Sequence, residues 1–196
     1  MSCDSALKGK RIGFGVTGSF CTHKAILETM QKLVDCGADV YPIFSDNTAS
    51  ISTRFMQSGE LFEQVEKITG KMPICTIKDA EPIGPKKLLD VITVVPCTGN
   101  TIAKLAGAIT DTPVLMACKS HLRNNRPIVI AVSTNDALAG NAKNIGILLG
   151  TKNYYFVPMG QDDPLKKPFS IVADFNKLNE TIELALEGCQ IQPILF

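Results

Sequence analysis

The sequence predicts an α/β fold in which a parallel β-sheet is covered on both faces by helices. Short segments that are apolar enough to be buried on both faces alternate along the chain with segments of helical periodicity. Each strand whose end can be recognised runs into small or polar residues, and in a parallel sheet such ends meet at one edge. A chain of 196 residues is expected to form a single domain, residues 1–196, with a core of its own.

The first half of the chain is expected to contain a strand, a helix and a second strand, followed by less regular segments. Ile26, Met30 and Leu33 recur at helical spacing, and Gly37 suits the position after a helix end. The proline-rich segment Asp79–Pro85 is expected to be irregular. The expected elements are a strand over Lys10–Val16, a helix from Phe20 to Cys36, a strand over Ala38–Phe44, a helix over Ile51–Thr69 broken near Gly59, and a short strand over Pro73–Ile77.

The second half of the chain repeats the alternation of strand and helix. Leu88–Val95 is the most apolar strand and is expected at the centre of the sheet. Met159–Phe169 is expected to be an irregular loop after the last strand. The other expected elements are strands over Pro127–Val132 and Tyr154–Pro158, and helices over Thr101–Ile109, from a cap at Asp111 or Thr112 to Arg123, over Ala137–Gly150 and over Phe175–Glu187.

Glycines at G-x-G-x-x-G spacing accompany the first strand. Gly13, Gly15 and Gly18 fall at these positions, and Thr17 and Ser19 add hydroxyl groups beside the last of them. Glycines permit a tight turn and let backbone N–H groups approach a phosphate, while a helix N-terminus adds positive potential. The pattern predicts either a phosphate-binding turn or a strand-to-helix turn that binds no ligand.

Polar clusters also follow the later strands. They are Ser45–Asn47, Cys97–Asn100 and Ser133–Asn135, and their convergence at one sheet edge predicts a ligand site there. Asp46 could bind the ribose hydroxyls of NAD, as an acid at this strand end does in dinucleotide-binding folds. The hydroxyl of Ser45, together with polar groups of the 98–101 turn, better suits one phosphate and a polyol chain, as in FMN.

Composition and charge exclude several classes of function. The net charge is +1, so no broad electrostatic field favours nucleic acid. No run of about 18 apolar residues is present, and the N-terminus lacks the apolar core of a signal peptide, so we expect a cytoplasmic protein without a membrane span. The seven cysteines are widely spaced, without a Cys-x-x-Cys motif, so neither a metal site nor a disulfide framework is expected.

The segment Pro96–Ala106 resembles the flavoprotein superfamily of FMN-binding cysteine decarboxylases and flavin prenyltransferases. Those proteins carry a similar turn before a small-residue helix, and a turn like Thr17–Ser19 after their first strand. The resemblance extends to Asp111, Leu122–Pro127 and Val157–Met159 and so spans nearly the whole chain. It implies a Rossmann-like, flavodoxin-like three-layer sandwich, and a homo-oligomer built from trimers with FMN at subunit interfaces.

The resemblance also implies which residues bind the cofactor. They lie in the turns after the first, second and third long strands and would hold the phosphate and ribityl groups of FMN. The alternative is that they are turn and cap residues without a ligand. The expected FMN-binding residues are Gly15, Thr17, Gly18, Ser19, Ser45, Pro96, Thr98, Gly99, Asn100 and Thr101.

The catalytic residues of the superfamily are not matched. The segment Ser52–Phe55 has no histidine where the decarboxylases have one, and Val132–Asn135 keeps only the asparagine of their Pro-Ala-Met-Asn segment. Ser133-Thr134 replaces the Arg-Glu pair of the prenyltransferases, and Leu165–Lys167 replaces their late Tyr and Arg. A decarboxylase or prenyltransferase activity therefore remains only an alternative.

His23 and Asn135 are the catalytic candidates that remain by position. His23 follows Ser19 closely enough to serve as an acid or base, or it is a surface or capping residue. Asn135 is either a ligand-binding residue or part of a turn. The other polar candidates are expected to have structural or surface roles: His121 facing solvent, Cys97 as a packed small residue, and Arg54, Lys166 and Lys167 as surface charges that could alternatively bind an anionic substrate.

Four separated stretches are similar to one branch of this superfamily, the B subunits of a two-subunit oxidoreductase of spore-forming bacteria. They are Gly15–Thr22, Ala80–Lys86, Pro96–Ala106 and Ser133–Leu138. The similarity implies an A subunit as partner, oxidation of a small dicarboxylate substrate, and a location in the mother-cell cytoplasm during sporulation. The alternatives are a non-catalytic B subunit, with NADP chemistry in the A subunit, and a nicotinamide-binding Rossmann protein.

Overall fold

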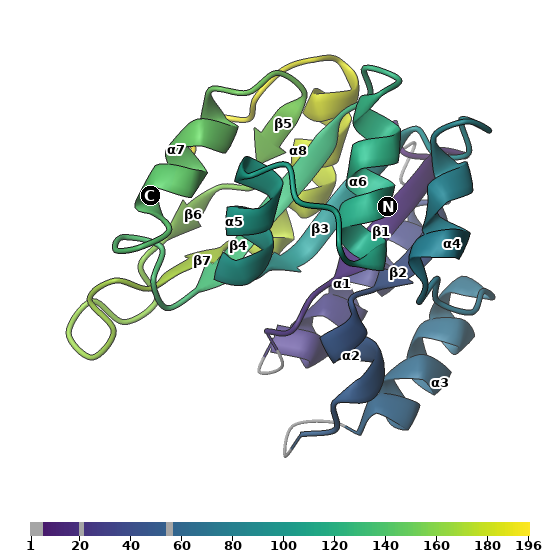
Figure 1. Cartoon of the computed structure of the whole chain (residues 1–196), viewed down its shortest axis with the longest axis horizontal. Helices are drawn as coiled ribbons and strands as arrows, with labels where there is room; N and C mark the ends of the chain where they lie inside the picture. The colour runs from purple at the N-terminus through teal and green to yellow at the C-terminus, as the bar shows by residue number, and fades with distance from the viewer. Residues whose placement is uncertain (1–5, 20–21, 54–56) are drawn as a thin grey trace.

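The computed structural model describes residues 6–19, 22–53 and 57–196. In these residues the strands form one seven-stranded sheet with the order β2-β1-β3-β4-β7-β6, and β5 also pairs with β4 (Figure 1). The strands are β1 (Arg11–Val16), β2 (Asp39–Phe44), β3 (Val91–Cys97), β4 (Ile128–Thr134), β5 (Tyr154–Phe156), β6 (Met159–Gly160) and β7 (Ile171–Ala173). The helices are α1 (His23–Asp35), α2 (Asp46–Ser50), α3 (Ser58–Thr69), α4 (Ile77–Ala80), α5 (Gly99–Ala106), α6 (Pro113–Leu122), α7 (Ala142–Leu149) and α8 (Leu178–Leu186), with 3₁₀ turns η2 (Glu81–Ile83) and η3 (Phe175–Lys177).

The parallel part of the sheet has the order β2-β1-β3-β4-β5. The chain moves outward from β1 to β2 and then crosses back to β3, so the strand order reverses between β1 and β3. In open α/β sheets, this reversal opens a crevice outside the carboxyl ends of the strands. The order confirms the predicted flavodoxin-like fold and places the candidate site beside β1 and β3.

Helices cover both faces of the sheet, which confirms the three predicted layers. In Figure 1, α5, α6 and α7 lie in front of the sheet, and α1 and α8 lie behind it. Every residue of β3 is buried, as expected for an interior strand between β1 and β4. Because both faces are covered, the strands are mostly apolar, and the buried Thr93 of β3 bonds through its hydroxyl to the Gly13 carbonyl oxygen.

Of the helix expected over Ile51–Thr69, only Ser58–Thr69 is helical, and a separate short helix, α2, lies just before this range. α2 ends at Ser50 and α3 begins at Ser58, so the break precedes Gly59, which lies in the first turn of α3. Ser45 caps α2, and its hydroxyl accepts a hydrogen bond from the Thr48 N–H at 3.3 Å. The local capping interaction starts a short helix directly at the end of β2, which hydrophobic periodicity does not reveal.

Other expected boundaries also change. Of the expected strand Pro73–Ile77, only Ile74 forms a bridge, with Ile43 of β2, and Ile77 starts α4. Helix α7 begins at Ala142, because Asn141 N–H bonds to the Asp136 carbonyl in a preceding turn. Helix α1 begins at His23, and the expected helical residues Phe20 and Cys21 lie outside the described part of the chain.

The segment expected to be a loop after β5 contains part of a second, antiparallel pairing. β6 pairs with β7, and β7 pairs in turn with Ser133 and Thr134 at the end of β4. The expectation that Tyr154–Pro158 is the last strand is therefore wrong. These strands have only two and three residues, too few to show a period of two in the sequence. Their pairing brings the 161–170 segment to the carboxyl edge of the sheet.

Candidate functional site

Two adjoining cavities open at the carboxyl edge of the sheet. The first, of about 380 Å³, lies between the ends of β1, β2 and β3, and the second, of about 610 Å³, lies between the ends of β1, β3 and β4 and the start of β7. Gly18, Thr98 and Asn100 line both cavities, so the two adjoin and together form one crevice in the surface. The polar strand ends meet around this crevice, at the point where the strand order reverses.

Most of the expected FMN-binding residues border this crevice. Those in the first cavity are Thr17, Gly18, Ser45, Thr98, Asn100 and Thr101, and those in the second are Gly18, Ser19, Thr98, Gly99 and Asn100. Gly15 and Pro96 line neither cavity.

Gly15 belongs to the packing of the sheet, which corrects its assignment as a cofactor contact. It lies within β1, where a Cβ atom would come within 3.0 Å of a Val114 methyl group on α6 and 3.1 Å of the Thr93 carbonyl oxygen. Gly13 is also within β1, and a Cβ there would meet the Leu89 side chain at 2.6 Å. Gly18 is the one glycine of the G-x-G-x-x-G pattern that lies in the turn after β1. Gly13 and Gly15 lie inside β1, where the lack of a side chain allows neighbouring strands and helices to pack closely.

Thr17 joins the ends of β1 and β3. Its hydroxyl donates to the Pro96 carbonyl oxygen at 2.7 Å and accepts from the Thr98 N–H at 3.2 Å. The Thr17 residue is 1% exposed, so this bridge is shielded from water. Thr17 and Pro96 therefore hold the turns after β1 and β3 together. In this way they position the residues that border the crevice.

The hydroxyls of Ser45 and Thr98 cap short helices at the first cavity. Thr98 accepts from the Thr101 N–H at 3.4 Å and lies 3.0 Å from the Thr101 hydroxyl. Asn100, in the first turn of α5, is exposed to both cavities, and its amide bonds to no other residue in the described part of the chain. Ser45 and Thr98 therefore act as helix caps, which was one of the two roles considered for the polar turn residues. The amide of Asn100 keeps its hydrogen-bonding groups available for a ligand.

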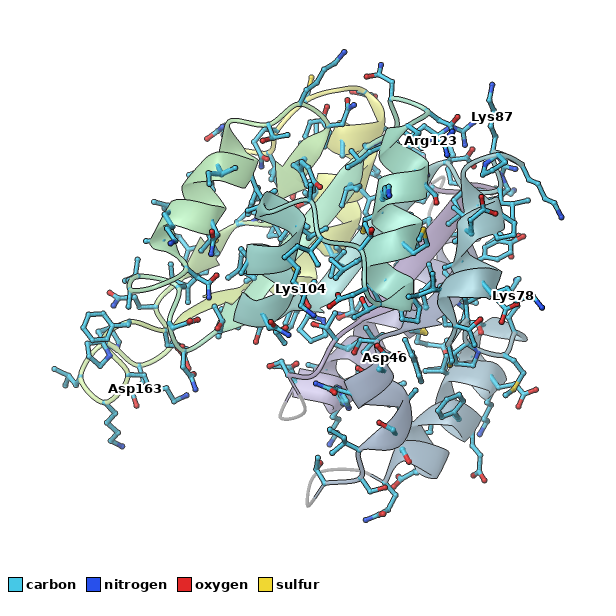
Figure 2. The ribbon with its side chains drawn as sticks, in the orientation of Figure 1. Asp46, Lys78, Lys87, Lys104, Arg123 and Asp163 are labelled. Carbon is cyan, nitrogen blue, oxygen red and sulfur yellow. The ribbon has the colours of Figure 1, made fainter. Side chains whose placement is uncertain are left out.

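The first cavity also contains an ion pair that sequence reasoning missed. Lys104 Nζ lies 2.7 Å from Asp111 Oδ2, and both residues line the cavity. Lys104 on α5 and Asp46 on α2 project from helices on opposite sides of this cavity (Figure 2). Lys104 lies four residues after Asn100, so the helical period could have indicated that both side chains share a face of α5.

Hydroxyl and amide groups dominate the second cavity. The Ser19 and Ser133 hydroxyl oxygens are 2.9 Å apart and connect the ends of β1 and β4. Asp136 Oδ1 accepts from the Thr134 hydroxyl at 2.6 Å, and Asp136 Oδ2 accepts from Asn141 Nδ2 at 2.8 Å. This network is held against the N-terminus of α5.

Gly99 makes close contact with that network. A Cβ atom at Gly99 would lie 2.6 Å from Asn141 Nδ2, 2.6 Å from Asp136 Oδ1 and 2.7 Å from Thr134 Oγ1. The glycine lets the polar ends of β3 and β4 approach each other. Asn135 lies in the adjoining turn and lines the second cavity, as its role as a candidate requires.

The two histidines are both buried and line neither cavity. Burial lowers the pKa of His23, so its imidazole is neutral at pH 7. His121 was expected to face solvent, but it is buried, and this burial, with Arg126 nearby, lowers its pKa to about 4. Neither position supports direct acid–base chemistry on a ligand in the crevice.

The remaining candidates differ in their access to the crevice. Cys97 is buried, and its burial raises the pKa of the thiol, in agreement with a packed residue rather than a nucleophile. Lys167 lines the second cavity, whereas Lys166 does not. Arg54 lies outside the described residues.

The donors in the crevice fit a phosphorylated polyol cofactor such as FMN. The N-terminus of α5 supplies positive potential in the first cavity, where Lys104 is paired with Asp111, and Asn100 offers amide donors beside the second cavity. The side chains of Thr134, Asp136 and Asn141 leave no room for a Cβ atom at Gly99. Among the described residues there is no group of three or more metal-ligating side chains, and none of their helices is long and apolar enough to cross a membrane.

Comparisons with known proteins agree with this architecture. The family model described as Flavoprotein matches residues 2–159. The dipicolinate synthase B subunit of Bacillus subtilis (strain 168) is 52% identical over 191 residues, which cover 97% of this chain and 96% of that protein.

Solved structures provide two further matches. The crystal structure of the dipicolinate synthase B subunit from Bacillus halodurans C has a TM-score of 0.90 and 46% identity, covering 97% of each chain. The FMN-dependent cysteine decarboxylase SpaF has a TM-score of 0.70 and 22% identity, covering 93% of this chain and 98% of that one, and supports the fold alone. The chain therefore belongs to the Flavoprotein family and, within it, to the family of dipicolinate synthase B subunits.

Proposed function

We propose that this chain acts with an A subunit to oxidise dihydrodipicolinate to dipicolinate, and that it binds FMN for this purpose. The observation that carries the proposal is the crevice of two adjoining cavities at the strand-order reversal, in a chain 52% identical to a dipicolinate synthase B subunit. The mother-cell cytoplasm of a sporulating bacterium is the location that this function implies.

The first cavity would hold the phosphate and ribityl groups. The N-terminus of α5 and the ammonium group of Lys104 favour a phosphate, and the amide of Asn100 can bond to a polyol hydroxyl. Thr17 joins the turns of β1 and β3 beside this cavity, which supports the assignment. The second cavity remains for the flavin ring and the substrate.

The reaction removes two electrons and two protons from the dihydropyridine ring. A bound flavin supplies a two-electron acceptor. The residues of this chain would bind the carboxylates, align the ring and exclude water, and the ordered hydroxyls of Ser19 and Ser133 lie at the centre of that surface. Because both histidines of the described chain lie outside the crevice, a proton would leave through polar groups there or through the A subunit.

The first test is flavin retention. FMN is added to the purified chain, excess is removed by desalting, and the absorbance spectrum is recorded. We expect retained flavin in the unaltered chain and a loss of at least about tenfold in FMN affinity for Asn100→Ala and for Thr17→Val, since each removes hydrogen bonds worth about 1–2 kcal/mol. Thr151→Val, an exposed threonine remote from the crevice, serves as the control and should retain FMN.

Full retention of FMN by both variants would refute the site assignment, and no retention by the unaltered chain would refute FMN binding by this subunit alone. The second candidate is then a non-catalytic B subunit, with nicotinamide chemistry in the A subunit. The absence of a titratable histidine from the crevice favours this candidate. Dipicolinate formation by the A subunit alone, with NADP, would support a non-catalytic B subunit over an FMN-dependent one.

The proposal includes a homo-oligomer built from trimers. Apolar side chains on or near α5 and α7 support it, because Ile109, Ile147 and Leu149 are 49%, 51% and 44% exposed. Ile147 and Leu149 lie in the C-terminal half of α7, and Ile109 follows the C-terminus of α5, so they are on one helical layer of the fold. Sedimentation equilibrium should give a mass that is a multiple of three chains, and a monomer at micromolar concentration would exclude this assembly.

A further inference from the structure

One cationic side chain borders the second cavity in the described part of the chain. It is Lys167, in the segment between β6 and β7. Its Nζ atom lies 2.7 Å from Asp162 Oδ2, and its side chain is 50% exposed. Lys166, the adjacent residue, does not line the cavity. The two lysines thus differ in access to the crevice although they share one loop.

The backbone around Lys167 is fixed by hydrogen bonds. The Lys167 N–H donates to the Asp163 carbonyl oxygen at 2.7 Å, and the Ser170 N–H donates to the Lys167 carbonyl oxygen at 3.0 Å. The Phe169 carbonyl accepts from the Leu138 N–H at 3.0 Å, which joins this segment to the turn after β4. Figure 2 shows Asp163 on the same projecting segment. The backbone of Lys167 is therefore held, while half of its side-chain surface remains exposed.

The carboxylate of Asp162 is positioned as well. It bonds to Lys167 and to the Ser170 hydroxyl, and both interactions hold the pKa of Asp162 below its usual value. Ser170 is 1% exposed and so provides a fixed anchor. The Asp162 carboxylate remains ionised and keeps the ammonium group of Lys167 at the rim of the cavity.

Other lining residues of the second cavity offer neutral donors. They are Asn100 in the first turn of α5, Ser133 in β4 and Asn135 in the turn after β4. The other acid of the wall, Asp136, is already bonded to Thr134 and Asn141. A ring that carries a carboxylate on each side of its nitrogen could therefore bond through one carboxylate to amide and hydroxyl groups and through the other to a cation.

We propose that Lys167 binds one carboxylate of the substrate and selects dicarboxylates over monocarboxylates. This inference rests on the proposed function. Asp162 is a positioning residue that holds the ammonium group when no substrate is bound and shares it when a carboxylate arrives. The binding step forms a charge-assisted hydrogen bond and transfers no electron or proton.

The test compares two ligands on the FMN-loaded chain, alone and with the A subunit. Pyridine-2,6-dicarboxylate and pyridine-2-carboxylate are titrated by isothermal calorimetry. The unaltered chain should bind the dicarboxylate at least about tenfold more tightly, and Lys167→Met should abolish most of that preference. Lys167→Arg should restore part of it. Lys166→Met, the matched control in the same loop, should leave the preference unchanged.

The outcomes separate this inference from the proposed function. A preference for the dicarboxylate that survives in Lys167→Met, with FMN retained, would overturn the role of Lys167 and leave the proposed function intact. No binding of the dicarboxylate to the unaltered chain, with or without the A subunit, would overturn both. Equal losses in Lys167→Met and Lys166→Met would show a general charge effect and also overturn the specific role.

Discussion

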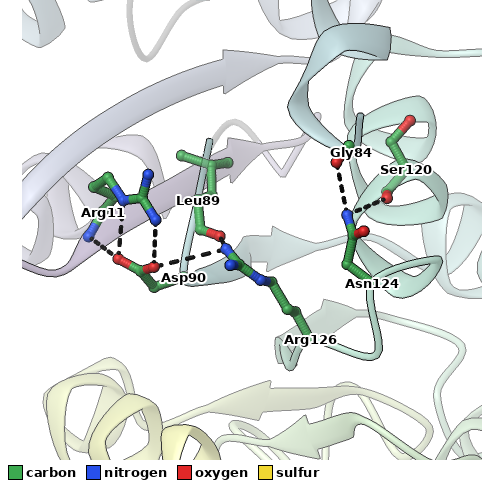
Figure 3. Close-up of polar contacts among 7 residues, drawn as sticks. All are labelled: Arg11, Gly84, Leu89, Asp90, Ser120, Asn124 and Arg126. Atoms are coloured by element: carbon green, nitrogen blue, oxygen red, sulfur yellow. Dashed lines mark hydrogen bonds and ion pairs between the residues drawn. The ribbon is translucent and has the colours of Figure 1, made fainter. Parts of the chain in front are cut away.

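The polar side chains at the two ends of the sheet differ in how far they are bonded to other residues of the fold. At the amino ends of the strands, Asp90 accepts from the backbone N–H of Arg11 at 2.9 Å and from its guanidinium at 2.7 Å, and lies 3.6 Å from Arg126 (Figure 3). The charged side chains at this end therefore form ion pairs with one another. At the carboxyl ends, hydroxyl and amide groups surround the crevice together with the ion pairs Lys104–Asp111 and Lys167–Asp162, and the amide of Asn100 bonds to no described residue.

This difference separates stability from binding. Arg11, Asp90 and Arg126 precede or begin neighbouring strands, so their mutual contacts hold the strands together without leaving space for a ligand. Arg126 also donates to the Leu89 carbonyl oxygen. The groups at the carboxyl edge are polar but are only partly used by the fold. Substitutions at the amino end should therefore reduce stability, and substitutions at the carboxyl edge should mainly reduce ligand affinity.

The largest effect is expected for Gly84→Ala, near the amino end. A Cβ atom at Gly84 would lie 2.4 Å from the Ser120 carbonyl oxygen, a backbone atom of α6, and the Gly84 carbonyl oxygen accepts from Asn124 Nδ2 at 2.7 Å (Figure 3). Because backbone must move, we expect a loss of about 3 kcal/mol in the free energy of unfolding. Urea denaturation measures it, with Gly59→Ala, which meets no atom, as the control. A loss below about 1 kcal/mol would contradict the contact.

The next effect concerns pH and His121. Its folded pKa is about 4 against an ordinary value of 6.5, so the unfolded chain binds the proton more readily. Stability should therefore fall as the pH drops from about 6.5 towards about 4, by roughly 2 kcal/mol between pH 7 and pH 5. Urea denaturation at both pH values, compared between the unaltered chain and His121→Gln, isolates this contribution. Equal pH dependence in both proteins would contradict it.

A smaller loss of stability is expected for Asp90→Ala, which removes the centre of the charged cluster. Hydrogen bonds to charged groups stabilise by about 1.5–3 kcal/mol, and partial exposure of Arg11 and Asp90 reduces this to about 1.5 kcal/mol. FMN retention should be unchanged. Thermal unfolding and the desalting assay measure the two properties separately. If Asp90→Ala lost FMN without losing stability, the amino end of the sheet would be involved in binding rather than in stability, which contradicts this comparison.

The smallest effect on stability, about 1 kcal/mol, is expected for Gly99→Ala at the carboxyl edge. Its Cβ would meet the side chains of Thr134, Asp136 and Asn141 rather than backbone, and side chains can shift at lower cost. That shift changes the wall of the second cavity, so FMN or dicarboxylate affinity should fall by about tenfold or more. Denaturation and calorimetry on the same variant test this. Unchanged affinity would show that the Gly99 contact has no part in binding.

Several features of the site could be predicted without coordinates because they depend on neighbouring residues. Thr112 caps α6 as expected, accepting from the Leu115 N–H at 3.3 Å. The polar ends of β1, β2, β3 and β4 meet at one edge because parallel strands share a direction. Strand alternation with helices was sufficient to predict the layers.

Other features depend on distant contacts. Gly13 and Gly15 match a phosphate-binding spacing, yet both lie inside β1, where Leu89 and Val114 press against them. His121 was expected to be exposed, but α6 is covered by α4 and η2, so nearly every side of this helix is buried. A helical period cannot reveal a layer supplied by residues some forty positions earlier in the chain.

The sequence by itself determined the alternation of strands and helices, the polar strand ends and the helix caps, since each arises from residues close together in the chain. Tertiary structure alone decided that Gly18, Thr98 and Asn100 border both cavities, that Lys104 pairs with Asp111, and that β6 and β7 bring Lys167 to the second cavity. The physical reason is that capping and periodicity are local, whereas a binding crevice is formed by side chains whose separation is set by packing of the whole sheet.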